Sequence, residues 1–332
     1  MATAALPPLV FAPLPVDRPW GGSRGAAALG IAAPPGAEAI GEWWLASARA
    51  SHPSRIVGGP LAGATLAELV ERDALRLLGA RSAAHHRGRF PLLLKLLDTS
   101  ASLSVQVHPS DASLPGEGKT ESWYIVEASA DATFWLGLRP GGAPADVIAA
   151  ARAGRSPETL LARHRAEPGL LAHLPPGTIH ALGAGIIAIE FQTNADTTWR
   201  IWDWGRQPGR ELHLAEAARD AAADQTPHLL AAAPDRTRSP PCDRLVDCDA
   251  YRVERLELSA PTHLATDGDR CELLVSLGTA LRVRSEAGAA EVPRGHAFLL
   301  PTATGDYVVT PEAPAELLRF LPAPAVAGRS SP

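Results

Sequence analysis

Short apolar runs separated by glycine and proline recur along most of the chain, and this pattern restricts the possible fold more than any other feature. Clear examples are P-L-L-L-K-L-L at 91–97, E-S-W-Y-I-V-E at 121–127 and Y-R-V-E-R-L-E-L at 251–258. Short runs bounded by turn residues are typical of β-strands. Many such strands at even spacing predict antiparallel sandwiches or barrels. The 332 residues suffice for two units of this kind.

We therefore expect two β-rich units, with a few helices attached to the first. Apolar residues at helical spacing predict helical segments near 64–80, 143–165 and 214–223. Proline-punctuated residues 226–241 are interpreted as a linker. The expected division is a first unit over 1–225, a second unit over 242–323 and a tail over 324–332.

Composition excludes several classes of protein. The formal net charge of -5, without a basic stripe, argues against a nucleic-acid partner. No apolar run approaches the length of a membrane span, and the N-terminus lacks the basic region of a signal peptide. Cys242, Cys248 and Cys271 are too few for a disulfide framework and miss the usual zinc spacings. We expect a globular cytoplasmic protein with reduced thiols.

Lysine is scarce in this sequence. Lys95 and Lys119 are its two lysines among 31 basic residues, and the others are arginine. Arginine can replace lysine where charge alone matters, but not where a compact ammonium or a titratable amine is needed. The two lysines therefore indicate a functional requirement, and the alternative is chance in a small number of residues.

The segment L-S-V-Q-V-H-P at 103–109 holds the first candidate site residues. On a strand, Gln106 and His108 point to one face, while Val105 and Val107 pack on the opposite side. An amide oxygen beside an imidazole is a plausible pair of metal contacts. Taken alone, a histidine in a strand is more often a partly buried structural residue than a metal ligand.

Two further segments carry candidate groups. In G-K-T-E-S-W at 118–123, Lys119 and Glu121 share a parity, so the amine and the carboxylate can face one cavity. The alternative is a surface turn with a local ion pair. In P-P-G-T-I-H-A-L at 175–182, His180 follows Gly177 by three residues, which resembles the second signature of the cupins. The alternative here is a turn with an incidental histidine.

The segment 190–206, E-F-Q-T-N-A-D-T-T-W-R-I-W-D-W-G-R, contains the single asparagine of the chain. If 198–204 is one strand, Arg200, Trp202 and Trp204 line one face. Arginine between aromatic walls suits a phosphate or sugar site, because its guanidinium can hold oxyanions bidentately. The alternative is that the tryptophans belong to the core and Arg200 stacks on them.

Together these segments resemble type I mannose-6-phosphate isomerase in its shorter bacterial form, a family of the cupin superfamily. P-W-G-G at 19–22, G-E-W-W at 41–44, G-P-L-A-G-A-T-L at 59–66 and R-E-L-H-L at 210–214 also match, in family order. The resemblance implies a mainly β fold of two cupin (jelly-roll β-sandwich) domains, of which the first is catalytic and the second metal-free. It also implies interconversion of mannose 6-phosphate and fructose 6-phosphate through a cis-enediol.

The resemblance further implies one divalent metal ion per chain, usually Zn²⁺. Its implied ligands are Gln106, His108, Glu121 and His180. Two histidines, a carboxylate and a neutral oxygen donor suit zinc and leave room for water or substrate, and Mn²⁺, Co²⁺ or Fe²⁺ would also be accepted.

The resemblance places Lys95, Lys119 and Arg200 in the substrate pocket. A lysine near a dication and an arginine can have a lowered pKa, so Lys119 is our first candidate for the base, followed by Lys95 and Glu190. Arg200 can stabilise the developing enediolate. Alternatively, it holds the 6-phosphate together with one or both lysines.

Three other functions stay open at this point. The same site could isomerise an unphosphorylated or different aldose. A non-catalytic sugar-binding cupin would be expected to lack ligands or a base, whereas this chain has both. A cupin dioxygenase would normally have His-x-His where this chain has Gln106-x-His108. We expect no partner other than a small phosphosugar, and a monomer or a weak homo-oligomer.

Overall fold

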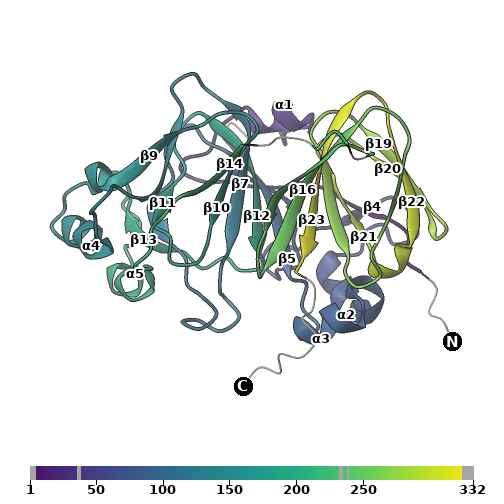
Figure 1. Ribbon diagram of the computed structural model, residues 1–332, viewed down its shortest axis with the longest axis horizontal. Helices are drawn as coiled ribbons and strands as arrows, with labels where there is room; N and C mark the ends of the chain where they lie inside the picture. The colour runs from purple at the N-terminus through teal and green to yellow at the C-terminus, as the bar shows by residue number, and fades with distance from the viewer. Residues whose placement is uncertain (1–4, 36–38, 232–234, 238, 324–332) are drawn as a thin grey trace.

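The computed structural model describes residues 5–35, 39–231, 235–237 and 239–323. Within these ranges the strands form four antiparallel sheets, and Figure 1 shows them arranged side by side as two sandwiches. The mainly β fold that the sequence predicts is confirmed. No described helix is long and apolar enough to cross a membrane.

The first sandwich has a larger and a smaller sheet. In sheet order, the larger contains β14 (His228–Ala231), β10 (Leu170–Leu174), β7 (Glu121–Ala128), β12 (Ile186–Thr193), β5 (Leu92–Asp98), β3 (Glu42–Ala46) and β2 (Leu14–Val16). The smaller contains β13 (Trp199–Trp202), β6 (Val105–Val107), β11 (His180–Ala181), β8 (Thr133–Leu138) and β9 (Leu161–Arg165). Trp123 and Ile125 of β7 pack against Phe134 of β8 between the sheets.

The second sandwich repeats this plan. Its larger sheet contains β15 (Cys242–Asp247), β16 (Tyr251–Leu258), β23 (Ala315–Pro322), β18 (Glu272–Ser276), β21 (Ala297–Leu300), β1 (Leu9–Phe11) and β4 (Ile56–Val57). Its smaller sheet contains β17 (Thr262–Ala265), β22 (Asp306–Pro311), β19 (Leu281–Ser285) and β20 (Gly288–Val292). Strands β1 and β4 precede residue 60 but belong to the larger sheet of the second sandwich. The expected division of the chain assigns them to the first unit, over 1–225.

The two larger sheets pack against each other, which is visible where β12 and β5 meet β16 and β23 in Figure 1. The ring of Phe320 on β23 lies 5.1 Å from that of Phe191 on β12 and 5.0 Å from that of Tyr251 on β16, measured between centroids. Every residue of β5 is buried, because the strand is covered on both faces. This explains why its sequence is a continuous apolar run rather than an alternating one.

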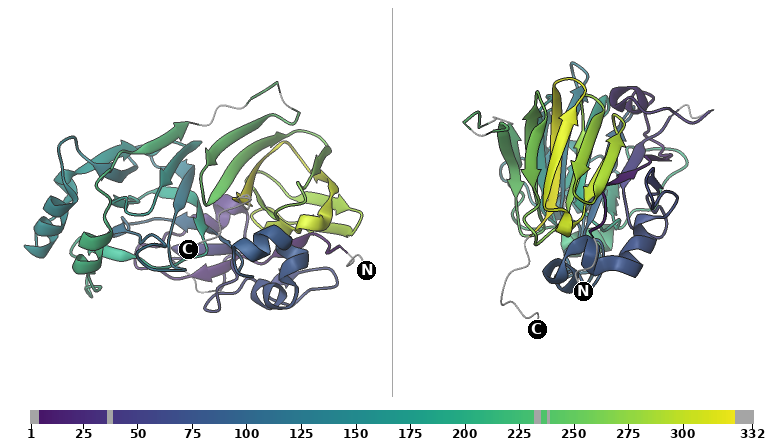
Figure 2. Two further views of the ribbon diagram at one scale, coloured as in Figure 1. Left: turned by 60° about the horizontal axis from the view of Figure 1, so that its bottom comes forward. Right: turned by 90° about the vertical axis from the view of Figure 1, so that its right-hand side faces the viewer.

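Helices cover the ends and one outer face of this core. They are α1 (Gly25–Leu29), α2 (Leu66–Leu78), α3 (Ala80–His85), α4 (Pro144–Arg152) and α5 (Leu214–Asp220), with 3-10 turns η1 (Glu158–Leu160) and η2 (Thr302–Thr304). A capping box of Thr65 and Glu68 begins α2. Val147 of α4 and Ala217 of α5 pack in one cluster with Val105 and Val107 of β6. The right-hand view of Figure 2 shows the blue helices α2 and α3 at one end of the sheets.

The local predictions differ from the structure in two places. In the range 143–165, α4 ends at Arg152 because Gly154 turns the chain with a φ of 70°, and Leu161–Arg165 forms strand β9 instead of helix. In the expected linker, His228–Ala231 forms strand β14 against β10. Linker residues 232–234 and 238 and the tail 324–332 lie outside the described residues.

Candidate active site

The candidate metal ligands meet between the two sheets of the first sandwich. Gln106 of β6 lies directly opposite His180 of β11 in the smaller sheet. Glu121 begins β7 in the larger sheet, and His108 follows the end of β6. Four positions spread over 75 residues of sequence are therefore brought together by the antiparallel register of the strands and the closure of the sandwich.

The contacts within this group are short. His180 Nε2 lies 3.2 Å from Glu121 Oε1, and His108 Nε2 lies 3.3 Å from Glu121 Oε2. Candidate ligand atoms of His108, Glu121 and His180 all lie within 4.8 Å of one another. Gln106 Nε2 lies 3.2 Å from His180 Nε2, so the amide borders the same space. All four side chains are buried.

The hydrogen bonds of the two histidines determine their tautomers. Nδ1 of His108 lies 2.9 Å from the Thr197 carbonyl oxygen, and Nδ1 of His180 lies 2.8 Å from that of Thr178. Because a carbonyl oxygen only accepts, each Nδ1 carries a proton, and in the neutral ring the Nε2 that faces Glu121 has the lone pair. Burial, assisted by the charge of Lys119, lowers the pKa of His108 to about 4, which keeps the ring neutral.

These groups fit a divalent cation. Both carboxylate oxygens of Glu121 are buried without a hydrogen bond of regular geometry among the described residues, and Oε2 forms a short ion pair with Lys119 Nζ at 2.6 Å. A buried carboxylate that faces two imidazole nitrogens is the donor set expected of a metal centre with ordered supporting partners. Burial opposes ionisation of Glu121, but the positive charge of Lys119 holds its pKa well below the ordinary value.

Lys119 points into the same space. Its Nζ lies 2.6 Å from Glu121 Oε2, 3.4 Å from His108 Nε2 and 3.9 Å from Glu190 Oε1. Burial by itself lowers the pKa of Lys119, but Glu121 and Glu190 outweigh it and raise the pKa above the ordinary value. The lowering expected from the sequence applies to a lysine beside a bound dication and stays a prediction.

Lys95 is surrounded by acidic groups. Its Nζ lies 3.4 Å from Glu190 Oε2, 3.4 Å from Asp196 Oδ1 and 3.7 Å from Glu42 Oε2, and 4.7 Å from the centre of the Trp44 ring. Burial disfavours its charge, but these carboxylates prevail and raise the pKa of Lys95. Burial also raises the pKa of Glu190 in spite of the two lysines.

Arg200 lies directly opposite Gln106 in the register of β13 and β6, so it projects from the strand next to the candidate ligands. Its Nη1 donates to the Glu211 carbonyl oxygen at 2.8 Å. Its buried Nε has no hydrogen-bond partner among the described residues. Burial and the neighbouring Arg210 lower the pKa of Arg200. The Nε–H of Arg200 is therefore a donor without an acceptor among the described residues.

The aromatic surroundings of Arg200 differ from the expected arrangement. Strand β13 ends at Trp202, and its register shifts between Arg200 and Trp202, so the regular alternation expected over 198–204 is interrupted. Trp204 has a φ of 58° in the following turn, and its ring packs at a tilt against that of Trp135, with centroids 5.0 Å apart. No described contact places the Arg200 guanidinium over an aromatic ring.

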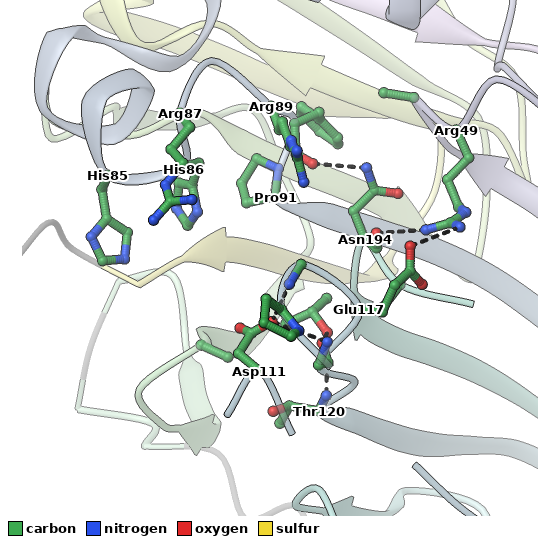
Figure 3. Close-up of a pocket in the computed structure, with 18 of the residues that line it drawn as sticks. Arg49, His85, His86, Arg87, Arg89, Pro91, Asp111, Glu117, Thr120 and Asn194 are labelled. Carbon is green, nitrogen blue, oxygen red and sulfur yellow. Dashed lines mark hydrogen bonds and ion pairs between the residues drawn. The ribbon is translucent and has the colours of Figure 1, made fainter. Parts of the chain in front are cut away.

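A separate cleft of about 1360 Å³ lies on the other side of the loop that precedes Lys119. Figure 3 shows Arg49, Glu117 and Asn194 on one side of it, and His85 and Arg87 on the other. Gly118 and Thr120 line this cleft, whereas the side chain of Lys119 between them turns to the candidate metal ligands. None of the four candidate ligands lines the cleft.

Sequence reasoning did not select Glu42 or Asp196 as members of the site. Both lie in quoted motifs, G-E-W-W and N-A-D-T-T-W-R, and both contact Lys95. The sequence pattern that could have indicated Glu42 is the alternation of the strand, which places Glu42 and Trp44 on one face. In the structure, Glu42 Oε2 accepts a hydrogen bond from Trp44 Nε1 at 2.8 Å. Nothing in the sequence indicated that this face covers Lys95.

Comparisons with known proteins identify a family model and several similar chains. The family model of the phosphomannose isomerase type I catalytic domain matches residues 15–128. The chain is 32% identical over 309 residues to mannose-6-phosphate isomerase ManA of Bacillus subtilis (strain 168), covering 90% of this chain and 95% of that protein. It is 33% identical over 206 residues to the mannose-6-phosphate isomerase of Streptococcus mutans serotype c, covering 60% and 62% of the two chains.

Solved structures extend the likeness to the whole fold. The crystal structure of the mannose 6-phosphate isomerase from Bacillus subtilis superimposes with a TM-score of 0.81 at 27% sequence identity. That match covers 94% of this chain and 99% of the other. Both sandwiches are therefore included, and the arrangement fits the cupin-like fold expected from the sequence.

Proposed function

The chain belongs to the type I family of mannose-6-phosphate isomerases, and we propose that it interconverts mannose 6-phosphate and fructose 6-phosphate at the site between β6, β7 and β11. The observation that carries this proposal is the approach of Lys119 to Glu121 and His108, within a buried group of candidate metal ligands. Aldose–ketose isomerisation moves a proton between C2 and C1 of the sugar, so it requires a base beside a polarised carbonyl.

A divalent ion would be held by Gln106, His108, Glu121 and His180, and we propose zinc as the ion. The two neutral imidazoles and the carboxylate suit Zn²⁺, and the same donors would accept Mn²⁺, Co²⁺ or Fe²⁺. When bound, such an ion supplies Lewis-acid polarisation of the sugar oxygens. The backbone carbonyls of Thr178 and Thr197 keep both rings in the ligating tautomer.

Lys119 is the proposed base. Its amine lies beside the candidate ligands, where the reacting carbons of a ligated sugar would lie, and it can accept the C2 proton and return it to C1. The amine must be neutral to accept a proton, and the charge of Glu121 opposes this. Engagement of Glu121 as a ligand would withdraw that charge from Lys119 and lower its pKa.

Lys95 and Glu190 are the next candidates for proton transfer. Lys95 is held between three carboxylates that keep it protonated, which suits a fixed cation better than a base. Glu190 lies between the two lysines and has a raised pKa, so it can relay a proton to Lys119 across 3.9 Å. We therefore rank both residues behind Lys119.

Arg200 is the proposed stabiliser of the enediolate. The position of Arg200 opposite Gln106 on the neighbouring strand supports this role. A preorganised cation there stabilises negative charge as it develops in the transition state. The 6-phosphate lies at the far end of the sugar, so a residue serving C1 and C2 is poorly placed to hold it. Holding the phosphate is the competing role for Arg200.

The proposal is tested by turnover of purified enzyme on mannose 6-phosphate and on mannose, with the ketose product detected by a coupled assay. We expect fructose 6-phosphate from the phosphosugar and far lower turnover of mannose. Preferred turnover of mannose would move the assignment to an isomerase of unphosphorylated aldoses. Binding of sugar without turnover of either substrate would indicate a non-catalytic cupin. A cytoplasmic location and a monomeric or weakly oligomeric state stay predictions from the sequence.

A further inference from the structure

We propose that Arg49 and Glu117 are positioning residues for the metal centre, acting as a clamp on the loop 194–197. The inference rests on the proposed function to the extent that His108 is a metal ligand there. Neither residue belongs to the ligand set or to the candidate catalytic groups. Their proposed effect is transmitted through Asp196 and Thr197, which the clamp holds in place.

The clamp contacts the loop at several points. Glu117 Oε2 accepts a hydrogen bond from Thr197 Oγ1 at 3.0 Å and one from the Asp196 backbone N–H at 3.4 Å. Arg49 Nη1 donates to the Asn194 carbonyl oxygen at 2.8 Å. Arg49 Nη2 lies 3.3 Å from Glu117 Oε1, which ties the two clamp residues together. Figure 3 shows Arg49 directed toward both Asn194 and Glu117.

The loop needs such external support. Residues 194–198 connect β12 to β13 and adopt neither helix nor strand, so no sheet ladder fixes their carbonyl groups. Glu117 replaces that ladder by accepting from both a backbone and a side-chain donor of the loop. Removal of the carboxylate therefore leaves the direction of the Thr197 carbonyl less determined.

Two groups of the site depend on this loop. The Thr197 carbonyl oxygen accepts the Nδ1–H of His108 at 2.9 Å, which orients the ring and selects its ligating tautomer. The Asp196 carboxylate lies 3.4 Å from Lys95 Nζ. One carboxylate, Glu117, thus connects the loop before β7 to a candidate ligand and to a buried lysine of the pocket.

Because the clamp is partly exposed, its effect on metal binding can be distinguished from an effect on the free energy of unfolding. The side chains of Arg49 and Glu117 are 24% and 33% exposed, and they line the cleft rather than the buried cluster. Partly exposed ion pairs contribute little to the free energy of unfolding. The loss of a partner that orients a metal ligand, by contrast, typically weakens metal binding by about 10- to 100-fold.

The test compares Glu117→Ala, Glu117→Gln and Asp247→Ala. Asp247→Ala is a matched control, because the Arg252–Asp247 pair has side-chain exposures of 22% and 36% and lies in the second sandwich. Glu117→Gln keeps an oxygen that can accept from Thr197. Cobalt affinity is measured by competition with a chromophoric chelator, together with the visible spectrum of bound Co²⁺ and with kcat and KM.

We expect Glu117→Ala to bind Co²⁺ about tenfold more weakly, with an altered spectrum and a loss concentrated in kcat. Glu117→Gln should restore most of the affinity, and Asp247→Ala should resemble the wild type. The proposal is overturned if Glu117→Ala and Asp247→Ala bind cobalt equally well with unchanged spectra. It is also overturned if Glu117→Gln is as impaired as Glu117→Ala while both are folded.

A measurement on the metal-free chain distinguishes failure of the clamp proposal from failure of the proposed metal-dependent function. The Nδ1–H proton of His108 should give a protected NMR resonance in the wild type that exchanges faster in Glu117→Ala. Unchanged exchange would contradict the clamp whatever the enzyme turns over. A wild-type chain that binds no cobalt but shows the exchange difference would instead contradict the proposed metal function and support the clamp.

Discussion

Lys119 Nζ lies 2.6 Å from Glu121 Oε2. Glu121 is the first residue of β7, and Lys119 precedes it by two positions. The spacing turns the amine and the carboxylate to the same side, and the neighbours Gly118 and Thr120 face the cleft on the other side. One carboxylate is thereby shared between a candidate base and a candidate metal site.

Replacement of Lys119 by arginine should preserve the charge and remove most of the turnover. A guanidinium stays protonated, so Lys119→Arg cannot accept the C2 proton, and we expect kcat to fall by about 100-fold or more. Steady-state kinetics on mannose 6-phosphate measure this, with metal content determined on the same sample. A variant with near-normal kcat and a full complement of metal would exclude Lys119 as the base.

The role of Arg200 can be assigned from the two kinetic constants. Because Arg200 lies opposite Gln106, we expect Arg200→Met to lower kcat by about 100-fold with a smaller change in KM. Arg206→Met is a suitable comparison, because Arg206 pairs with Asp203 on the turn that follows β13. A change confined to KM for the phosphosugar would place Arg200 at the 6-phosphate instead.

Glu42 should make the stability of the protein depend on pH in the acid range. Burial opposes its ionisation, but Lys95 and Arg18 outweigh this and lower the pKa of Glu42 from 4.5 to about 2. Its contribution, about 3 kcal/mol to the free energy of unfolding, is complete above pH 4.5 and is lost as the pH falls toward 2. Glu42→Gln removes this contribution.

Urea unfolding of wild type and Glu42→Gln at a series of pH values tests this expectation. The difference in the free energy of unfolding should be largest near neutral pH and should narrow steadily below pH 4.5. Parallel curves over the whole range would show that the carboxylate ionises alike in the folded and unfolded chains.

The packing of the two larger sheets should couple the stability of the sandwiches. Phe320→Ala creates a cavity between Phe191 and Tyr251, and we expect a cost of about 3–5 kcal/mol. All eight tryptophans precede residue 205, so their fluorescence reports on the first sandwich. The unfolding midpoint of the first sandwich should shift, although the substitution lies on β23 of the second sandwich. An unchanged fluorescence transition beside a shifted circular-dichroism transition would show that the sandwiches unfold separately.

The sequence predicts which side chains share a face when all of them lie on one strand. Period-two parity predicted that Val105 and Val107 pack away from the site, and both contact the cluster under α4 and α5. The same parity predicted that Lys119 and Glu121 face one space. These relationships need only the pleat of one strand, and no knowledge of which strands pair.

Long-range relationships were not predictable from the pattern. The uninterrupted apolar sequence of β5 indicates burial on both faces but does not identify the second sandwich as the covering partner. The pairing of β1 with β21 places Leu9 opposite Leu299, which is 290 positions further along the chain. The acidic partners of Lys95 were missed for the same reason, because Glu42 and Asp196 approach it from other segments.

We propose that this protein isomerises a phosphosugar at a site that requires a bound divalent ion. This proposal is tested most directly by the rate of fructose 6-phosphate formation before chelation, after chelation and after addition of zinc, for wild type and for Glu121→Gln and Glu127→Gln. Glu127 is an exposed residue of the same strand and serves as the control. We predict that chelation abolishes turnover, that zinc restores it in wild type and Glu127→Gln, and that Glu121→Gln stays inactive. Absence of turnover in a folded, zinc-loaded wild-type sample would contradict the account.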